Sequence, residues 1–455
     1  MTFWNKLMVA APVAAALTFG FTPTADACGG CFVPPEENTV VTGHRMILSV
    51  GMEQSTLYDQ IEYDGDPAEF AWVLPTRGLV EVGISSDLVF NQLGFDTGVT
   101  VLPPPLECPS YNCGDELSAA GEDGFGATGA GGANGGGVNV IAQEVVGPYE
   151  TVQLEATDPD ALNDWLDSHG YQIPDEIQPI IDDYLAEGFN FLAMRLVPGV
   201  GVDKMSPVRI TTPGAQAALP LRMVAAGTGA TTTVTLWVIG EGRYQPQNFP
   251  SFSIEADNVV WNYGTNDSNY AELRQGAYDA SNGFAWQTES SFKYSPEAFT
   301  SNIVNVVSFN GPEQSGYDDG SGDWQQAEEA AYEDMDTLFA GLNSDDVWVT
   351  RMRAELSRAA LVQDLAVEAA EEQENLSPVI QTTKWVGTQP ACPPPPECYD
   401  GGNGSDDGLF PGGGSGEGCA VSDSDDGRFD DSSLISAALV GLGLAFARRR
   451  RRRRN

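Results

Sequence analysis

Runs of apolar and β-branched residues, several of them alternating with small or polar residues, dominate the pattern of this chain and predict β-strands. Residues 189–197 alternate in this way, as a half-buried strand does. Residues 70–74 form a continuous apolar run that ends at Pro75, which is typical of a buried strand. The same signals predict further strands at 46–50, 231–239 and 302–309, and a hairpin within 138–154 around Gly147-Pro148.

Four segments carry apolar residues at helical spacing instead. Asp158 and Pro159 are typical of a helix start, and the next two turns place Leu162, Trp165 and Leu166 on one face. The pattern as a whole predicts a strand-dominated α+β fold with antiparallel sheets and about four helices. The other three helices are expected at 177–185, 324–342 and 357–370.

Composition divides the chain into a body and its flanking segments. The body is expected to span residues 28–390, and with 42% hydrophobic residues overall the chain has ample material for one large or two coupled domains. Within it, residues 121–137 are glycine-rich with almost nothing to bury, which predicts a flexible loop. Residues 391–433 begin with cysteine and proline and continue with Asp, Gly and Ser, which favours a disordered linker.

Residues 1–27 have the pattern of a signal peptide. A positive charge at Lys6 precedes the apolar run 7–20, and Ala25-Asp26-Ala27 has the small-x-small form of a signal-peptidase site. Cleavage between Ala27 and Cys28 makes Cys28 the first mature residue. Lipidation of Cys28 is the alternative, although Asp26 stands where a lipoprotein signal has a small residue. We therefore expect the export machinery and signal peptidase as partners.

The C-terminal end combines a lone cysteine, an apolar run and an arginine block. Gly418-Cys419 precedes an acidic spacer, and residues 434–447 are apolar. An apolar segment that ends in arginines stops in a bilayer with the arginines facing the cytoplasm. This run is shorter than the ~20 residues of a stable span, which favours a temporary membrane segment over an ordinary tail anchor. The arginines of the tail, residues 448–455, begin with Arg448, Arg449 and Arg450.

All seven cysteines lie beyond the signal peptide, which agrees with an oxidising compartment. Six of them form close sequence pairs, so local disulfides are expected, and Cys419 is left over. A redox or metal site at Cys28-Gly29-Gly30-Cys31 is the alternative for the first pair. The residues that follow, Phe32-Val33-Pro34-Pro35, favour an extended chain over the helix of a redox motif. The expected pairs are Cys28 with Cys31, Cys108 with Cys113, and Cys392 with Cys398.

Charge narrows the range of partners. With 65 acidic and 22 basic residues, the chain has a formal net charge of −43. Such a surface repels nucleic acid and anionic lipid, so we expect neither as a partner of the body and expect membrane contact only through residues 434–454. Two acidic segments, 317–323 and 400–408, have the composition of loose calcium loops but not the EF-hand spacing, and solvated linkers are the simpler interpretation.

Candidate catalytic groups are few. The two histidines are expected to be structural, because His44 stands beside a predicted strand and His169 at a predicted helix C-terminus, where a cation is favourable. No nucleophile elbow, zinc-protease motif or phosphate loop occurs. Arg351 and Arg353 have the spacing to project from one face of a strand onto a carboxylate such as Asp59, as a structural ion pair or as part of a site. The sequence therefore predicts no catalytic residue, metal ligand or resident cofactor.

Several blocks, in order along the chain, carry a family resemblance. The opening blocks lie at 27–32, 44–46, 56–67 and 70–75, and the later ones at 165–174, 184–189, 350–353 and 361–365. They resemble family 2330 of the domains of unknown function over about residues 27–370. The resemblance implies an exported bacterial protein without an established activity, and it supplies no catalytic residues.

The tail separately resembles the myxobacterial C-terminal sorting signal, on Gly418-Cys419 and the terminal arginines. That resemblance implies an intramembrane sorting protease as a partner, cleavage near Cys419, passage through the inner membrane and retention at the cell surface on the outer membrane. The acidic spacer 420–433 departs from the pattern by its length.

Two classes of function follow from these observations. We expect an exported, surface-anchored, non-catalytic structural or binding protein. The alternative is a surface enzyme, either a hydrolase or a redox protein that uses Cys28 and Cys31, whose site is not visible in one sequence.

Overall fold

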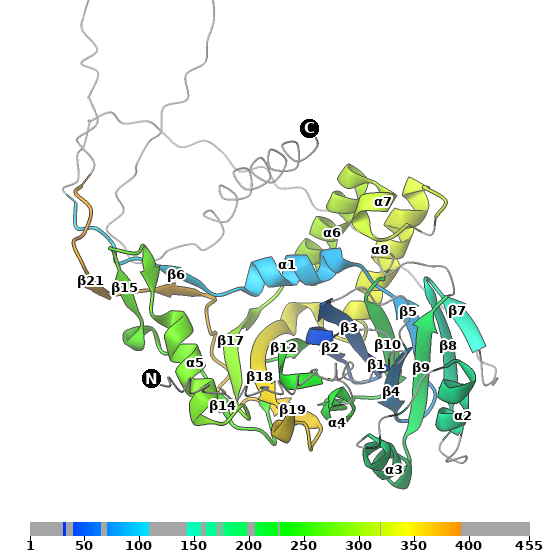
Figure 1. Ribbon diagram of the computed structural model, residues 1–455. Coiled ribbons are helices and arrows are strands. Elements are labelled where there is room, and N and C mark those ends of the chain that lie inside the picture. Colours follow the sequence, from blue (N-terminus) through cyan, green and yellow to red (C-terminus); the bar gives the residue numbers. More distant parts are fainter. Residues whose placement is uncertain are drawn as a thin grey trace, which may run out of the picture. The chain divides into compact units, whose positions relative to one another are not determined.

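A computed structural model describes residues 31–32, 40–64, 71–108, 143–155, 161–170, 173, 175, 177–197, 205–225, 228–318 and 320–392 (Figure 1). The chain divides into two units, residues 1–394 and 395–455, and all the described residues belong to the first. The predicted signal peptide, the glycine-rich segment 121–137 and the sorting tail lie outside the described residues.

An eight-stranded mixed sheet forms the centre of the described unit. Its β2 strand pairs in parallel with β12 and antiparallel with β3, and the edge strand β14 pairs in parallel with β17. In spatial order the strands are β14 (Ser251–Phe252), β17 (Trp286–Lys293), β18 (Val347–Ser357), β12 (Thr228–Glu241), β2 (Val40–Val50), β3 (Gln54–Asp64), β10 (Val208–Pro213) and β5 (Glu81–Ile84).

A second sheet is wholly antiparallel and contains the expected hairpin around Gly147. Its order is β1 (Cys31–Phe32), β4 (Ala71–Thr76), β9 (Asn190–Leu196), β8 (Tyr149–Leu154) and β7 (Gln143–Val146). Three small sheets join β11 (Ala218–Leu219), β19 (Leu365–Ala369) and β13 (Tyr244–Pro246); β16 (Asp267–Ser268), β15 (Val260–Asn262) and β21 (Lys384–Val386); and β20 (Val379–Gln381) with β6 (Thr100–Leu102).

Alternation along the strands separates the core into layers. On β12, Leu236 and Val238 face a core completed by α4, β11 and β19, whereas Trp237 and Ile239 face the opposite core, beneath α1, α6 and α8. Figure 1 shows these three helices on one side of the large sheet. The helices are α1 (Asp87–Thr97), α2 (Ala161–Ser168), α3 (Gln178–Ala186), α4 (Leu221–Val224), α5 (Tyr270–Ala280), α6 (Pro296–Asn310), α7 (Pro312–Ser315) and α8 (Trp324–Leu338).

The five-stranded sheet also has two apolar faces. Trp72 and Leu74 of β4 pack with Val208 and Ile210 of β10, so this face is buried against the large sheet. The alternate β4 residues, Ala71 and Val73, pack with α2 and α3 on the other side. The expected class, a strand-dominated α+β fold, is therefore confirmed.

The number of helices and two of the element assignments were wrong. Eight α-helices lie in the described part of the chain instead of about four. Residues 302–309 belong to α6, because the Ser295 hydroxyl caps its start by accepting from the Ala298 N–H at 3.1 Å and Pro296 occupies its first turn. Residues 357–370 are not a helix: β18 ends at Ser357, a 3₁₀ turn spans Arg358–Ala360, and β19 follows.

None of the helices among the described residues is long and apolar enough to cross a membrane.

Candidate functional site

A cleft of about 240 Å³ opens between the eight-stranded and the five-stranded sheet, where the end of β4 meets β2, β3 and β10. Most of its walls are apolar; of its polar residues, Ser55 and Thr76 are buried, whereas Arg77 and Glu187 are exposed at the rim. One wall is the segment after β10, which the Ser55 hydroxyl fixes by donating to the Gly214 carbonyl at 3.0 Å and accepting from the Gln216 N–H at 2.8 Å. The apolar walls are formed by Leu48, Leu57, Leu74, Pro75, Phe189, Ile210, Ala218, Leu219 and Pro220.

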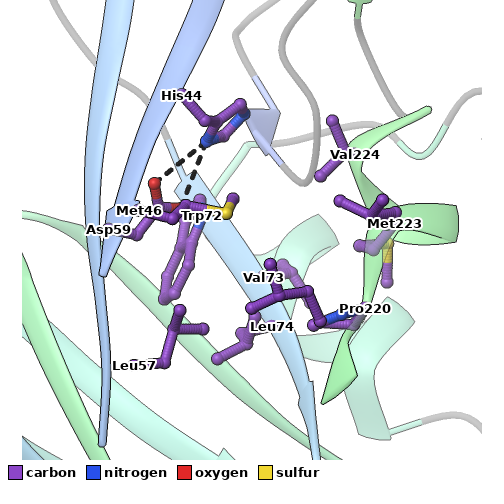
Figure 2. A pocket seen from close by; sticks show the side chains of 12 residues that line it. His44, Met46, Leu57, Asp59, Trp72, Val73, Leu74, Pro220, Met223 and Val224 are labelled. Carbon is purple, nitrogen blue, oxygen red and sulfur yellow. Dashed lines mark hydrogen bonds and ion pairs between the residues drawn. The ribbon is translucent and has the colours of Figure 1, made fainter. Parts of the chain in front are cut away.

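A smaller cavity of about 20 Å³ continues the cleft inward and shares part of its wall, including Leu57 and Leu219. Its volume is that of a single water molecule. His44 and Asp59 stand at its inner side, with Trp72 and Met46 between them and the apolar wall (Figure 2). The only histidine of the central sheet therefore lies at the inner end of this apolar space.

His44 and Asp59 form a buried pair in which Nδ1 of His44 lies 3.0 and 3.2 Å from the two carboxylate oxygens (Figure 2). Their exposed fractions are 1% and 3%. An ionised carboxylate only accepts hydrogen bonds, so Nδ1 carries the proton and Nε2 of a neutral His44 is the basic nitrogen. This geometry orients the imidazole.

The β2–β3 hairpin places this pair. In its register Asp59 lies opposite Met46, and His44 lies opposite Ile61, so His44 and Asp59 are diagonal neighbours on one face. The expected assignment of Asp59 as a partner of Arg351 and Arg353 was therefore wrong.

Arg351 and Arg353 lie instead on the opposite face of the large sheet. Arg351 Nε forms an ion pair with Glu289 at 2.6 Å, and its Nη1 donates to the Gly94 carbonyl of α1 at 3.2 Å. Arg353 lies 3.9 Å from Glu355. The Glu289 side chain is 3% exposed, so this ion pair is buried. It joins the neighbouring strands β17 and β18 outside the cleft, and Arg351 also holds α1 against the sheet.

The rim of the cleft carries one tightly bonded charged group. Arg222 makes a bidentate pair with Glu187, at 2.7 and 2.8 Å, and also donates to Asp364 at 2.9 Å. The Tyr184 hydroxyl donates to Asp364 at 2.5 Å. The hydrogen bonds from Arg222 lower the pKa of Glu187, and burial together with the adjacent Asp364 charge raises the pKa of Tyr184.

Arg77, which directly follows β4, is the other cation of the rim. Its guanidinium lies 4.1 Å from the centroid of the Phe189 ring, in a cation–π contact, and its side chain is exposed. Among the described residues, no acceptor lies within hydrogen-bonding distance of this guanidinium. The rim therefore contains one cation whose N–H donors are available to a ligand.

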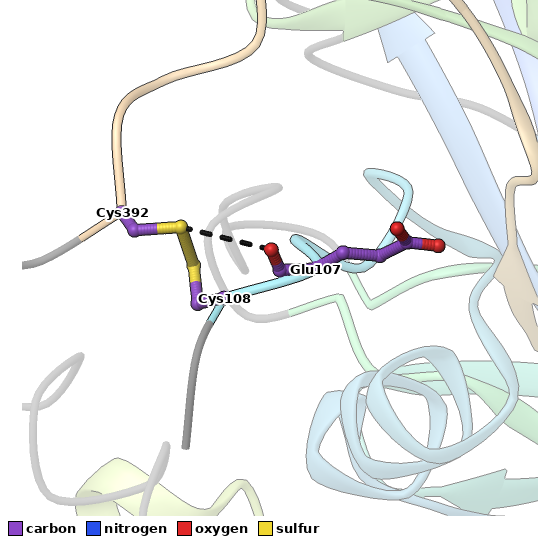
Figure 3. The surroundings of a disulfide bond; sticks show 3 residues. All are labelled: Glu107, Cys108 and Cys392. Atoms are coloured by element: carbon purple, nitrogen blue, oxygen red, sulfur yellow. Dashed lines mark hydrogen bonds between the residues drawn. A yellow bond between two sulfur atoms is a disulfide. The ribbon is translucent and has the colours of Figure 1, made fainter. Parts of the chain in front are cut away.

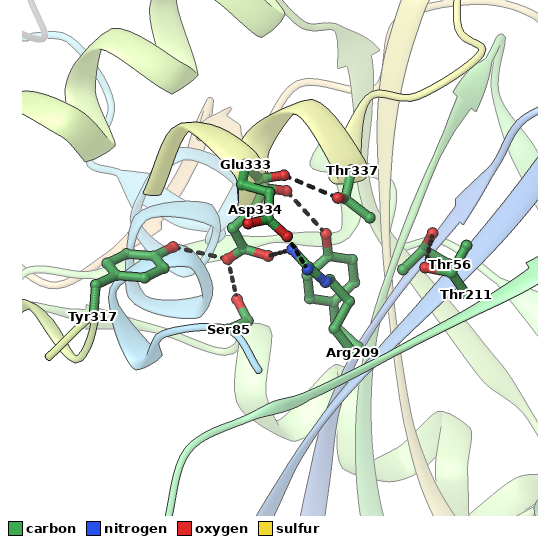
Figure 4. Close-up of polar contacts among 9 residues, drawn as sticks. Thr56, Ser85, Arg209, Thr211, Tyr317, Glu333, Asp334 and Thr337 are labelled. Carbon is green, nitrogen blue, oxygen red and sulfur yellow. Dashed lines mark hydrogen bonds and ion pairs between the residues drawn. The ribbon is translucent and has the colours of Figure 1, made fainter. Parts of the chain in front are cut away.

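A second polar cluster lies away from the cleft, beneath α8 (Figure 4). The Asp334 carboxylate, fully buried, accepts from Ser85 at 2.6 Å, from Tyr317 at 2.8 Å and from Arg209 at 3.1 Å. Burial raises the pKa of Asp334, and Arg209 opposes that rise. These hydrogen bonds connect α8 to the sheet and to the segments that carry Ser85 and Tyr317, so the cluster has a structural role.

The disulfide framework differs from the local pairing expected for two of the three pairs. Cys108 bonds to Cys392, 284 residues away in sequence, with a Cα–Cα distance of 5.6 Å (Figure 3). The parallel pairing of β6 with β20 brings the two segments together, because each cysteine follows one of these strands. The expected pairs with Cys113 and Cys398 are therefore wrong, and those two cysteines lie outside the described residues. The side chains of Cys28 and Cys31 are likewise not described, nor are Ala27, Gly418, Cys419 and the arginines from Arg448 to Arg450.

The remaining sequence candidates lie apart from the cleft. His169 follows α2, where its Nδ1 lies 2.7 Å from the Trp165 carbonyl and its ring packs on the Trp165 ring. In the acidic segment 317–323, Asp318 accepts from the backbone of Gly320 and Gly322, and Asp323 caps α8. Within the described ranges, no three His, Cys, Asp or Glu side chains are grouped so as to hold a metal ion.

The chain belongs to a family described as an uncharacterized protein conserved in bacteria (DUF2330), whose profile matches residues 22–363. This confirms the family resemblance of the body, whereas the resemblance of the tail to the sorting signal stays a prediction. A search of curated proteins finds no match. The crystal structure of baculovirus P35 shows a weak likeness, with 9% identity and a TM-score of 0.23. The alignment covers 46% of this chain and 66% of that one, just under two thirds of its length, and carries no argument about function.

Proposed function

We propose that this family member is an exported, surface-anchored binding protein that takes a small, largely apolar ligand into the cleft between its two sheets. The observation that carries the proposal is the cleft itself, a 240 Å³ space with mostly apolar walls and exposed charged groups, Arg77 and Glu187, at its rim. Ligand sites in proteins have this composition, in which apolar walls supply affinity and a few polar groups orient the ligand.

Several features support export and display. The sequence begins with a signal-peptide pattern and ends with Gly418-Cys419, an apolar run and arginines. A disulfide between Cys108 and Cys392 suits an oxidising compartment. The partners of this route are the export machinery, signal peptidase and an intramembrane sorting protease, with transit through the inner membrane to the outer-membrane surface.

The cleft is tested by blocking it. Ala218 is an exposed residue of its wall, and Ala215 is an exposed residue of the same segment that does not line it. Ala218→Trp is expected to abolish the binding of small apolar compounds in calorimetric titration, whereas Ala215→Trp leaves it unchanged. Equal binding by both variants would refute the cleft as the binding site.

Display is tested through Cys419. Cys419→Ala is expected to leave the melting temperature unchanged and to remove the protein from the cell surface, measured by surface proteolysis and fractionation. Unchanged surface display would contradict the sorting route while leaving the cleft proposal intact.

A surface enzyme, such as a hydrolase, is the second candidate, and the buried pair of His44 and Asp59 is the observation that favours it. A neutral imidazole held by a carboxylate is a common general base. His44→Gln separates the two candidates. If the protein is a binding protein, the variant retains its ligand affinity to within a few-fold. If it is an enzyme that uses His44 as a base, the variant loses its turnover, and the pH dependence of the rate that His44 causes disappears. The redox alternative at Cys28 and Cys31 is tested separately, by thiol alkylation of the native protein.

A further inference from the structure

We propose that the ligand of the cleft is an apolar monocarboxylate of about ten non-hydrogen atoms, whose carboxylate pairs with Arg77 at the rim while its apolar part fills the cleft. This inference rests on the proposed binding function and specifies the class of ligand.

Arg77 supplies the hydrogen-bond donors for the carboxylate. The central carbon of its guanidinium lies 4.1 Å from the centroid of the Phe189 ring, and among the described residues nothing accepts from its N–H groups. A guanidinium presents a planar fork of N–H donors, which matches a carboxylate with two parallel hydrogen bonds. In a chain with a net charge of −43, a cation at the mouth of an apolar cleft is a specific feature, and this one interacts with the Phe189 ring and the Glu187 charge but with no hydrogen-bond acceptor among the described residues.

The carboxylates of the rim, in contrast, already accept several hydrogen bonds from within the protein. Both Glu187 oxygens accept from Arg222, at 2.7 and 2.8 Å. Asp364 accepts from the Tyr184 hydroxyl, the Arg222 backbone N–H and the Arg222 guanidinium, at 2.5, 3.0 and 2.9 Å. A cationic ligand would have to compete with Arg222 for these carboxylates, whereas an anionic ligand meets donors that are available. The hydrogen-bond donors of Arg77 therefore favour an anion.

The volume sets the size of the apolar part. A cavity of about 150 Å³ accommodates benzene, with its six carbon atoms. The 240 Å³ cleft therefore holds about ten non-hydrogen atoms on the same scale. Leu57, Leu74 and Leu219 line the part that continues toward the inner cavity, so the apolar end of the ligand points inward and the carboxylate points to the rim.

Three probes test charge and apolar body separately. Octanoate has ten non-hydrogen atoms, octanamide is its uncharged isostere, and acetate is the head group without the body. Calorimetric titration of the full chain with each is expected to give octanoate about ten-fold tighter binding than octanamide, since a charge-assisted hydrogen bond contributes about 1.5 kcal/mol or more. Acetate is expected to bind too weakly to measure.

Arg77→Gln tests whether Arg77 causes the preference for octanoate over octanamide. In this variant octanoate and octanamide are expected to bind equally, while Lys293→Gln, which removes a surface cation that does not line the cleft, keeps the ten-fold preference. Arg77→Lys keeps the charge but not the fork, so it is expected to retain part of the preference. Melting temperatures of the variants show that each is folded.

Two results would overturn the inference and leave the proposed function standing. Either octanamide binds the unchanged protein as tightly as octanoate, or the octanoate preference persists in Arg77→Gln; in both cases the cleft remains the binding site if Ala218→Trp abolishes binding. Failure of both octanoate and octanamide to bind, or binding that Ala218→Trp leaves unaffected, overturns the proposed function together with the inference.

Discussion

Arg209 and Asp334 form an ion pair in the interior of the protein, with 3.1 Å between Nη1 of the arginine and Oδ1 of the carboxylate (Figure 4). Arg209 extends from β10, and Asp334 lies on the buried face of α8. The pair connects a strand that lines the cleft to a helix on the other side of the sheet, so the stability of the whole layer depends on it.

Removing the arginine is expected to be costly. Arg209→Met leaves the Asp334 charge buried without its partner and is expected to lower the free energy of unfolding by about 3–5 kcal/mol at pH 7, measured by urea denaturation. Arg209→Met combined with Asp334→Asn removes both charges, keeps an oxygen that accepts from Ser85 and Tyr317, and is expected to recover most of this loss. No recovery in the double variant would show that the arginine acts through packing alone.

The same variant has a defined pH dependence. Burial raises the folded-state pKa of Asp334 above its ordinary 3.8, so the folded protein binds this proton more tightly than the unfolded chain. The destabilisation by Asp334 is therefore fully present above the raised pKa and is relieved as the pH falls toward 3.8. Without Arg209 the pKa rises further, so the stability difference between Arg209→Met and the unchanged protein is expected to narrow as the pH is lowered.

Gly83 of β5 leaves the space that the Arg209 side chain occupies. A Cβ atom at this position would lie 2.7 Å from Arg209 Nε and 2.9 Å from Nη2. Gly83→Ala is therefore expected to displace the guanidinium and to cost about 1–3 kcal/mol in chemical denaturation. Gly229→Ala in β12 is the control, because nothing lies within 4 Å of its added methyl group. Equal effects of the two substitutions would contradict the close approach.

Reduction of the disulfide is expected to destabilise the protein. Cys392→Ala removes the bond to Cys108 and is expected to cost about 2–5 kcal/mol, since the bond closes a long loop of the unfolded chain. Peptide mapping without reduction is expected to recover Cys108 joined to Cys392. A peptide joining Cys108 to Cys113 would restore the local pairing and contradict this framework.

Tyr270 of α5 is expected to affect stability at alkaline pH. Burial and the nearby Glu289 charge raise the pKa of Tyr270 from 10.0 to about 12. The folded state thus binds the phenolic proton more tightly, so the stability from this group is present below pH 10 and is lost as the pH rises toward 12. Between pH 8 and 11, Tyr270→Phe is expected to lose less stability than the unchanged protein in thermal melts, and parallel curves would disprove the role of this group.

Strands with strong local signals were predictable from the sequence. Residues 70–74, 189–197 and 231–239 correspond to β4, β9 and β12, because their side chains are buried in the patterns that strands impose. The β-branched residues at 302–309 favoured a strand, but they lie in α6. The serine cap and the proline at 295–296 start that helix. At 357–370, Leu361 and Leu365 are both buried, but in separate elements that tertiary packing brings together.

The cleft could not be found in the same way. Leu57, Arg77 and Phe189 come from three separated segments, and Leu219 from a fourth, so no local spacing relates them. The pair of His44 and Asp59 did have a signal, since a tight turn at 51–53 sets the hairpin register that makes them diagonal neighbours. The disulfide partner of Cys108 had none, because only the pairing of β6 with β20 brings Cys392 near it.

The bond between Cys108 and Cys392 also determines how the chain transmits tension. The two sulfur atoms provide a covalent path that bypasses the 284-residue separation between them, which includes most strands of the large sheet. A molecule tethered beyond Cys392 and pulled by its N-terminal strands lengthens only through residues outside this ring. Mechanical load between these two points would therefore fall on the strands before Cys108, β2 to β6, and would bypass the strands inside the ring.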